Sequence, residues 1–305
     1  MKLPRIHLFE FEDQPWCPAV IRDLATDYLH FIETKFALHR PVVGLLSEAL
    51  RATKADHVVD LCSGGGGPIP ALQKALAAEG LTVHFTLTDR FPNVQAFQQA
   101  AINSRSRIAF VAELVDAKAV PARFSGFRTL FNSFHHFRPT DAVAILRDAA
   151  EAGQPIGIFE IPDRTLRTIV PVMLLTPFMV ALATPFIRPF RWSRLLWTYL
   201  VPVVPLTFWW DGIVSQLRAY TPAELELLAN SMATGGYSWR AGQCANLVHS
   251  RPPDLPAGLS KQPQEHTCPL KPCFLRVRSW RTAHLQVSRV RAHREFNCSG
   301  RLSVR

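Results

Sequence analysis

A short apolar run that ends in four consecutive glycines constrains the fold of this 305-residue chain more than any other feature. The run HVVDLCS occupies residues 57–63, and GGGGP follows it directly at 64–68. Its β-branched residues predict a buried strand, and the periodicity after it predicts a helix. Glycine suits such a turn because it adopts positive φ and lets a ligand lie against the backbone. Since the free amides at the helix start favour an anion, we expect the turn to bind a small charged ligand.

Apolar, β-branched runs alternate with amphipathic segments through the first half of the chain. The predicted strands are 57–62, 82–88, 108–115, 127–133 and 155–161, and the predicted helices lie within 17–50 and near 69–79, 93–103 and 140–151. This alternation favours right-handed crossovers and a parallel sheet covered on both faces. The expected fold class is therefore α/β, a Rossmann-like, doubly wound and mainly parallel sheet with N-terminal helices and an apolar insertion.

The composition changes along the chain, which predicts four segments. They are an N-terminal helical segment (1–50), the Rossmann-like core (51–165), an apolar insertion with the end of the core (166–240), and a basic Pro/Arg-rich tail (241–305). The net charge is +10, but residues 240–305 hold twelve Lys or Arg against three Asp or Glu, so the rest is nearly neutral. The basic character therefore says little about the site upstream, and no specific nucleic-acid partner is expected.

Two features bear on location. The N-terminal sequence MKLPRIHLFEFEDQPW lacks the apolar stretch of a signal-peptide core. The six cysteines include no CxxC pair, which favours reduced thiols. We therefore expect a cytoplasmic protein.

Common nucleotide-binding patterns do not fit the glycine turn. The dinucleotide fingerprint G-x-G-x-x-G needs a glycine where Ile69 or Pro70 stands, and no Gly-Lys-Ser/Thr follows for a phosphate-binding loop. The acidic Asp60 at the end of the first strand, the glycines after it and Asp89 at the end of TLTD (86–89) form a different pattern. With VVDLCSGGGG as its first motif, the chain resembles the class I S-adenosylmethionine-dependent methyltransferases over about 40–161, and more weakly to about 240. The family usually has glycine where Cys62 stands.

The resemblance implies S-adenosyl-L-methionine as cofactor. In such enzymes the glycine turn holds the methionine part and the carboxylate closing the second strand takes both ribose hydroxyls. Asp116, in VDA at 115–117, resembles the acid that contacts the adenine amino group, although a solvated turn residue is an alternative. The cofactor-binding residues expected on this basis are Asp60, Cys62, Ser63, Gly64, Gly66, Asp89, Arg90, Asp116, Ala117 and Asn132.

The end of the fourth predicted strand supplies the catalytic candidates. The segment NSFHH at 132–136 resembles the family segment beneath the reactive sulfonium, and ligands bind at the carboxyl ends of such strands. His135 or His136 is expected to touch the substrate, because adjacent residues of a regular strand cannot both face a pocket. A base is needed only if the acceptor must lose a proton during in-line methyl transfer. A metal site is the weaker alternative, because no third ligand lies nearby in the sequence, so none is expected.

The insertion contains two long uncharged runs. TIVPVMLLTPFMVALATPFI spans 168–187 and a second run spans 195–210, each interrupted by prolines. A membrane span, an amphipathic or re-entrant membrane contact, and an aromatic-rich soluble lid over the pocket all remain open. All three favour a hydrophobic small-molecule or lipid acceptor, with a membrane surface as a further partner. The substrate-contacting candidates are Glu160, Trp209, Asp211 and Arg218.

Alternatives remain for the tail and for the function as a whole. The tail is interpreted as a poorly ordered appendage, as a divergent closure of the sheet by a strand at 274–278 or 284–290, or as a nucleic-acid- or zinc-binding segment. The rivals to an enzyme are a noncatalytic Rossmann-like cofactor-binding module and a membrane-associated structural protein. Binding of S-adenosylmethionine would separate the last of these from the other two.

Overall fold

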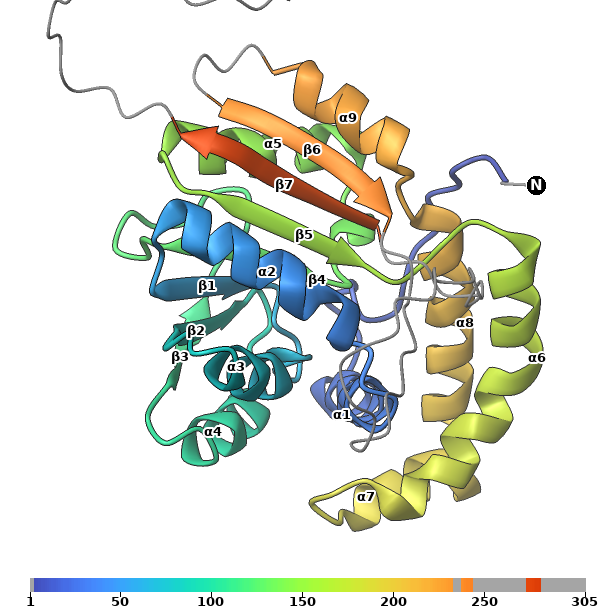
Figure 1. Ribbon diagram of the computed structural model, residues 1–305. Coiled ribbons are helices and arrows are strands. Elements are labelled where there is room, and N and C mark those ends of the chain that lie inside the picture. The colour runs from blue at the N-terminus through green and yellow to red at the C-terminus, as the bar shows by residue number, and fades with distance from the viewer. Residues whose placement is uncertain (1–2, 233–236, 244–272, 281–305) are drawn as a thin grey trace, which may run out of the picture.

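A seven-stranded sheet in the order β3-β2-β1-β4-β5-β7-β6 forms the centre of the molecule (Figure 1). The computed structural model describes residues 3–232, 237–243 and 273–280. The strands are β1 His57–Leu61, β2 His84–Asp89, β3 Ile108–Leu114, β4 Phe127–Phe131, β5 Ile156–Glu160, β6 Tyr237–Gln243 and β7 Cys273–Trp280. The first five are parallel to one another, and β7 is antiparallel to both β5 and β6. The predicted α/β, doubly wound and mainly parallel fold is confirmed.

Helices cover both faces of the sheet because each central strand is apolar on both sides. The helices are α1 Ala19–Lys35, α2 Arg40–Thr53, α3 Ile69–Ala78, α4 Val94–Ile102, α5 Pro139–Glu151, α6 Leu166–Ala183, α7 Trp192–Leu195, α8 Val203–Arg218 and α9 Pro222–Asn230. Val58 packs with α2, α3 and α4 on one face, whereas its neighbour Val59 packs with α5 and α9 on the other (Figure 1). This two-sided burial explains why the strands read as continuous apolar runs.

The chain reverses its direction of winding between β1 and β4. The strands β1, β2 and β3 run outward to one edge, and β4 returns to the other side of β1. The loops after β1 and β4 therefore diverge and leave a crevice at the carboxyl ends of the strands, which is where ligands bind in open sheets of this kind. The glycine turn follows β1, and the two histidines follow β4 in the short helical turn Phe134–His136.

The apolar insertion packs beside the core and not over the crevice. Helices α6 and α8 lie side by side (Figure 1), and Val180 of α6 and Val204 of α8 share a buried cluster with Leu24 and Tyr28 of α1. Residues Leu166–Phe186 are long and apolar enough to cross a membrane, a property that core helices of soluble proteins share. The second run forms a pair, Trp192–Leu200 and Val203–Arg218, bent by 75°.

Part of the basic tail belongs to the sheet. The candidate strand at 274–278 lies within β7, which pairs with β5 through Gly157–Glu160 and with β6 on its other side. This is the sheet closure that was one of the three interpretations of the tail. The other candidate strand, at 284–290, and three of the residues behind the zinc interpretation, His266, Cys268 and Cys298, lie outside the described residues.

Candidate functional site

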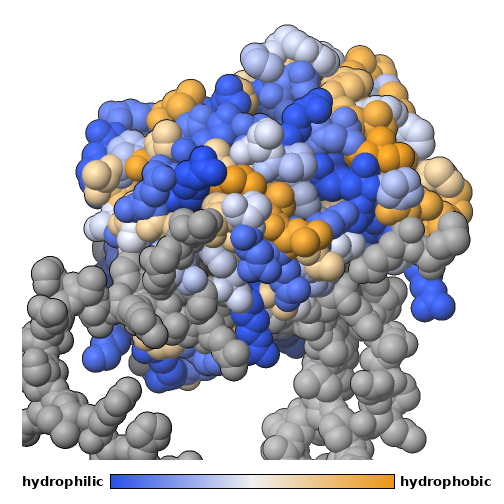
Figure 2. Space-filling view, turned by 90° about the horizontal axis from the view of Figure 1, so that it is seen from above, coloured by the Kyte–Doolittle hydropathy of each residue, from blue (hydrophilic) through white to orange (hydrophobic). Residues whose placement is uncertain are grey.

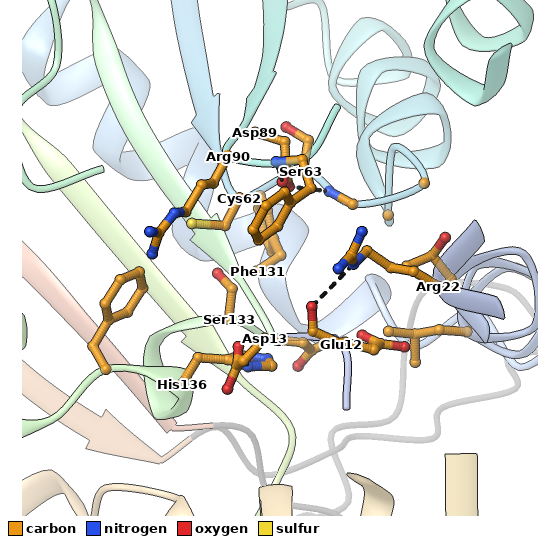
Figure 3. Close-up of a pocket in the computed structure, with 18 of the residues that line it drawn as sticks. Glu12, Asp13, Arg22, Cys62, Ser63, Asp89, Arg90, Phe131, Ser133 and His136 are labelled. Atoms are coloured by element: carbon orange, nitrogen blue, oxygen red, sulfur yellow. Dashed lines mark hydrogen bonds and ion pairs between the residues drawn. The ribbon is translucent and has the colours of Figure 1, made fainter. Parts of the chain in front are cut away.

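A cavity of about 430 Å³ opens at the carboxyl ends of β1, β2 and β4. The glycine turn and Asp89 line one end, and His136 with the N-terminal residues Glu12 and Asp13 lines the other (Figure 3). Helix α1 contributes a third wall through residues such as Glu33. The volume falls within the range of about 300–1,000 Å³ that is typical of small-molecule sites.

The glycine turn is shaped by both its backbone and its neighbour α1. Gly64, Gly66 and Gly67 have φ of 53°, 92° and 45°, a region that side chains disfavour. A Cβ on Gly65 would lie 3.3 Å from the carbonyl oxygen of Thr26 in α1, so the close approach of this helix also requires glycine. His30 Nδ1 lies 2.8 Å from the carbonyl oxygen of Gly67 and ties the turn to α1.

Cys62 departs from the family pattern at a position where the backbone favours glycine. Its φ is 57°, in the left-handed region that costs a residue with a Cβ roughly 1–2 kcal/mol. The family that the chain resembles usually has glycine at this position, and the positive φ explains that preference. Cys62 lines the cavity next to Ser63 (Figure 3).

Asp89 and the glycine turn form one unit. Oδ2 of Asp89 accepts a hydrogen bond of 2.7 Å from the amide of Gly64, and Oδ1 accepts one of 2.7 Å from the amide of Phe91. Gly64 and Phe91, which donate these hydrogen bonds, line the cavity, and so does Arg90. The carboxylate that follows β2 is thus fixed at the edge of the turn that follows β1.

Asp60, expected to bind the cofactor, does not reach the cavity. It is buried, with Oδ2 accepting 2.7 Å from Ser63 Oγ and Oδ1 accepting 2.6 Å from Thr129 Oγ1. Burial raises the pKa of Asp60 to about 7. Its structural role is to hold the start of the turn through Ser63, which itself lines the cavity.

Three more residues of the expected cofactor set also lie outside the cavity wall. The amide of Gly66 donates a hydrogen bond to the carbonyl oxygen of Ser63 within the turn. Asp116 accepts from the amide of Lys118, the bond of a turn residue, and Ala117 is buried in the core against α5. The expected residues that the structure does bring into the cavity are Cys62, Ser63, Gly64, Asp89, Arg90 and Asn132.

Glu33 is a cavity residue that the sequence did not indicate. It lies near the end of α1 with 2% of its surface exposed, and its Oε1 accepts a hydrogen bond from Asn132 Nδ2. Its other oxygen, Oε2, is buried and has no hydrogen-bond partner among the described residues. Burial raises the pKa of Glu33 to about 7. A buried carboxyl oxygen without a donor, facing a cavity, suits a cationic ligand.

The two histidines have different surroundings. His136 lines the cavity, and its Nδ1 lies 2.8 Å from both Asp13 Oδ1 and Glu10 Oε2. His135 is buried, with Nδ1 2.5 Å from Glu160 Oε2. Burial by itself lowers the pKa of His136, but Glu10 and Asp13 raise it well above its usual range. His136 is therefore a hydrogen-bond donor at neutral pH and is not poised to accept a proton.

Of the four substrate candidates, only Arg218 reaches the cavity. It donates to the carbonyl of Leu8 and to Asp13 Oδ2, at 2.7 and 2.6 Å. Glu160 is buried against His135, and the indole of Trp209 lies against α6, where its Nε1 donates to the carbonyl of Met173.

Asp211 anchors the N-terminal segment that lines the cavity. Its two oxygens accept hydrogen bonds of 2.8 and 3.2 Å from the amides of Phe11 and Glu12. Together with Arg218 it holds residues 7–14 along the cavity, a wall that the sequence did not predict. The aromatic residues of the insertion, which one of the three alternatives placed over the pocket, do not line the cavity.

Comparison with known proteins finds likeness in three-dimensional structure alone. No family model and no curated protein matches the sequence. The methyltransferase domain of bacterial CtHen1-C matches with 16% identity and a TM-score of 0.44, over 79% of this chain and all of that one. The plantazolicin methyltransferase BpumL, solved with SAH, matches with 10% identity and a TM-score of 0.44, over 85% of this chain and 95% of that one. The O-methyltransferase NcsB1, solved with S-adenosylmethionine and 2-hydroxy-5-methyl naphthoic acid, matches with 24% identity and a TM-score of 0.31, over 40% of each chain. At these identities and scores the likeness assigns no activity, so the chemistry of the site rests on its own geometry.

Proposed function

We propose that this chain is an S-adenosylmethionine-dependent methyltransferase of a hydrophobic small-molecule or lipid acceptor. The observation that carries the proposal is the single unit formed by Asp89 and the glycine turn, with Gly64 donating 2.7 Å to the carboxylate at the edge of the cavity. A carboxylate there suits the two vicinal hydroxyls of a ribose, because it accepts from both. The turn beside it brings backbone close to whatever lies in the cavity.

The charges around the turn fit both ends of such a cofactor. The unpartnered Oε2 of Glu33 lies 3.7 Å from where a Cβ on Gly67 would be, so it faces the inner side of the turn. An ammonium would satisfy this oxygen by donating a hydrogen bond and by its charge, whereas an anionic ligand would be repelled. Glu33, Asp89 and the glycine turn would hold the cofactor, which supplies the methyl group when bound.

The rest of the cavity supports an acceptor that is apolar with a polar group. Phe9, Phe91, Phe131 and Phe137 line it beside the ion cluster of His136. The charged imidazole and Arg218 would orient an acceptor oxygen or nitrogen, and positioning alone lowers the barrier of an in-line displacement. Acceptors that need no base in the transfer step suit the site best, because His136 is already protonated.

We also propose a cytoplasmic location with peripheral contact to the inner face of a membrane. The outer side of the insertion exposes large apolar residues, and Figure 2 shows such residues at the right-hand side, where α6 lies in Figure 1. They include Leu174, Leu175, Phe178, Leu182, Phe186, Trp192 and Leu200, each more than half exposed. Arg167 in the first turn of α6 and Arg188 beyond its end are both exposed, which suits a helix lying along an anionic lipid surface.

Calorimetry with S-adenosylhomocysteine tests the proposal, followed by a turnover assay with labelled methyl donor and a lipid extract. We expect one binding site per chain and transfer of label to an extractable product. Absence of heat at millimolar nucleoside would overturn the proposal. Binding without transfer to any acceptor would leave a noncatalytic cofactor-binding module in its place.

A further inference from the structure

Three side chains from distant parts of the sequence converge behind the cavity. Glu10, His135 and His136 each offer one metal-ligating atom, and these atoms all lie within 4.8 Å of one another. Glu10 and His135 are 1% and 2% exposed, so the group is not an ordinary solvated surface cluster. Two imidazoles and one carboxylate form a donor set that transition metals bind in proteins.

The groups around the cluster hold these ligands in place. Nδ1 of His135 lies 2.5 Å from Glu160 Oε2, while Glu160 Oε1 accepts 2.8 Å from the amide of Phe134. No hydrogen bond within the described residues occupies Nε2 of His135, which leaves that nitrogen for a ligand. A histidine whose other nitrogen is bonded to a buried carboxylate is the arrangement that orients metal-ligating imidazoles.

Glu10 is oriented in the same way. Its Oε1 lies 3.3 Å from Arg218 Nη1, and its Oε2 lies 2.8 Å from His136 Nδ1. The guanidinium thus holds one oxygen and directs the other toward the histidines. Asp13 repeats the pattern from the cavity side, with one oxygen on Arg218 and the other on the same nitrogen of His136.

The balance of charge also calls for a cation. Three carboxylates, those of Glu10, Asp13 and Glu160, form side-chain ion contacts with the two histidines, and the guanidinium of Arg218 is the cation paired with them. Metal binding would displace the proton that His136 holds between Glu10 and Asp13, and with both imidazoles neutral this group carries two net negative charges in a buried place. A divalent ion neutralises them, whereas burial without one is costly.

We propose that Glu10, His135 and His136 bind a divalent transition-metal ion, for which Zn²⁺ is the best match. Zn²⁺ accepts two imidazoles and a carboxylate, whereas Mg²⁺ and Ca²⁺ favour all-oxygen sets. Of the three ligands, His136 lines the cavity, so the ion would lie at the cavity wall. His136 lies across the cavity from the glycine turn (Figure 3), and the ion would take a ligand there with an oxygen or nitrogen donor atom. This inference does not rest on the proposed function.

Metal titration of the full chain tests the proposal. After treatment with EDTA, the chain is titrated with Zn²⁺ by calorimetry, its metal content is measured by elemental analysis, and Co²⁺ is added to record the visible absorption of the bound ion. We expect one equivalent of Zn²⁺ per chain and an intense band of four-coordinate Co²⁺. Glu160→Gln, which removes the orienting carboxylate and keeps the ligands, should weaken Zn²⁺ binding about ten- to a hundredfold.

The controls separate this site from adventitious binding. His84→Ala removes an exposed histidine of β2 and should leave the stoichiometry and affinity unchanged, whereas His135→Ala and Glu10→Gln should abolish the Co²⁺ band. A folded wild-type chain that takes up no stoichiometric Zn²⁺ would overturn the proposal. So would equal affinities of the His84→Ala and His135→Ala variants. The nucleoside is absent from these measurements, so their failure is distinct from failure of the proposed function.

Discussion

The amide of Gly64 donates a hydrogen bond of 2.7 Å to Oδ2 of Asp89 across two neighbouring strands. The bond joins the turn after β1 to the carboxylate that ends β2 and holds the two at one edge of the cavity. A ligand that contacts the turn therefore meets a carboxylate whose position is already fixed. Preorganisation of this kind lowers the cost of ordering the site on binding.

Asp89→Asn should weaken binding of S-adenosylhomocysteine about ten- to a hundredfold, because a charged acceptor on a hydroxyl contributes about 1.5–3 kcal/mol. Calorimetric titration measures the effect. Asp116→Asn is the matched control, since Asp116 carries a turn bond outside the cavity wall and should leave the affinity unchanged. Equal losses in the two variants would remove Asp89 from the site.

Glu33→Gln should abolish the pH dependence of cofactor affinity. Burial raises the pKa of Glu33 to about 7 from its usual value near 4.5, so the carboxyl is largely protonated at pH 6 and ionised at pH 8. A cationic cofactor binds the ionised form better, so affinity of the wild type for S-adenosylmethionine should rise between pH 6 and 8. Calorimetric titrations of the wild type and of Glu33→Gln with S-adenosylmethionine at pH 6 and pH 8 measure this change in affinity. A wild-type affinity that is flat over this window would contradict the assignment.

Asp60→Asn should stabilise the folded protein, relative to the wild type, more at pH 8 than at pH 5. The pKa of Asp60 in the folded chain is about 7, above its usual value near 3.8, so its contribution to stability is present below pH 4 and is lost as pH rises through 7. Asn retains an acceptor for Thr129 without the buried charge. Denaturant unfolding should show the variant gaining about 3 kcal/mol over the wild type between pH 5 and pH 8. If the difference in unfolding free energy between variant and wild type is the same at both pH values, Asp60 is not neutral in the native state.

Cys62→Gly should be more stable than Cys62→Ala by about 1 kcal/mol. Both variants lose the thiol, and only alanine keeps a Cβ in the left-handed backbone at φ 57°. Urea unfolding of the pair isolates the backbone effect. If alanine is as stable as glycine, the backbone at this position relaxes without cost.

The double variant Phe178→Ser, Leu182→Ser should lose binding to phosphatidylglycerol vesicles by about tenfold or more, since each buried side chain contributes about 1.5–3 kcal/mol. Sedimentation with vesicles measures it. Ile102→Ser in α4 is the matched control, because that side chain is 73% exposed but lies outside the insertion. Wild-type protein that stays in the supernatant with anionic vesicles would exclude the membrane contact.

The sequence was sufficient for the five parallel strands and for one side of the site. Hydrophobic period is a local property that locates these strands, and the helices between them favour right-handed crossovers and a parallel sheet. The meeting of Asp89 with the glycine turn follows from the same rule, because neighbouring parallel strands end at one edge. Arg90 and Asn132 reach the cavity for this reason too.

The other side of the site depends on contacts that leave no local signal. Asp60 is closed off by Thr129, 69 residues away, so its distance from the ligand could not be read from the motif. Glu33 and Glu10 enter through the packing of α1 and the N-terminal segment. A third metal ligand was sought near the histidines in sequence, whereas the structure supplies it from more than a hundred residues upstream.

Residues 7–14 can take their place in the cavity wall only after α8 has been synthesised. Residues 7–14 wall the cavity because Asp211 and Arg218 of α8 hold them, and those two residues are made some two hundred positions later. Until α8 has emerged, the nascent chain has the first five strands and the glycine turn but an incomplete pocket. The chain can therefore bind its ligand only after α8 has been made, which is later than the first five strands.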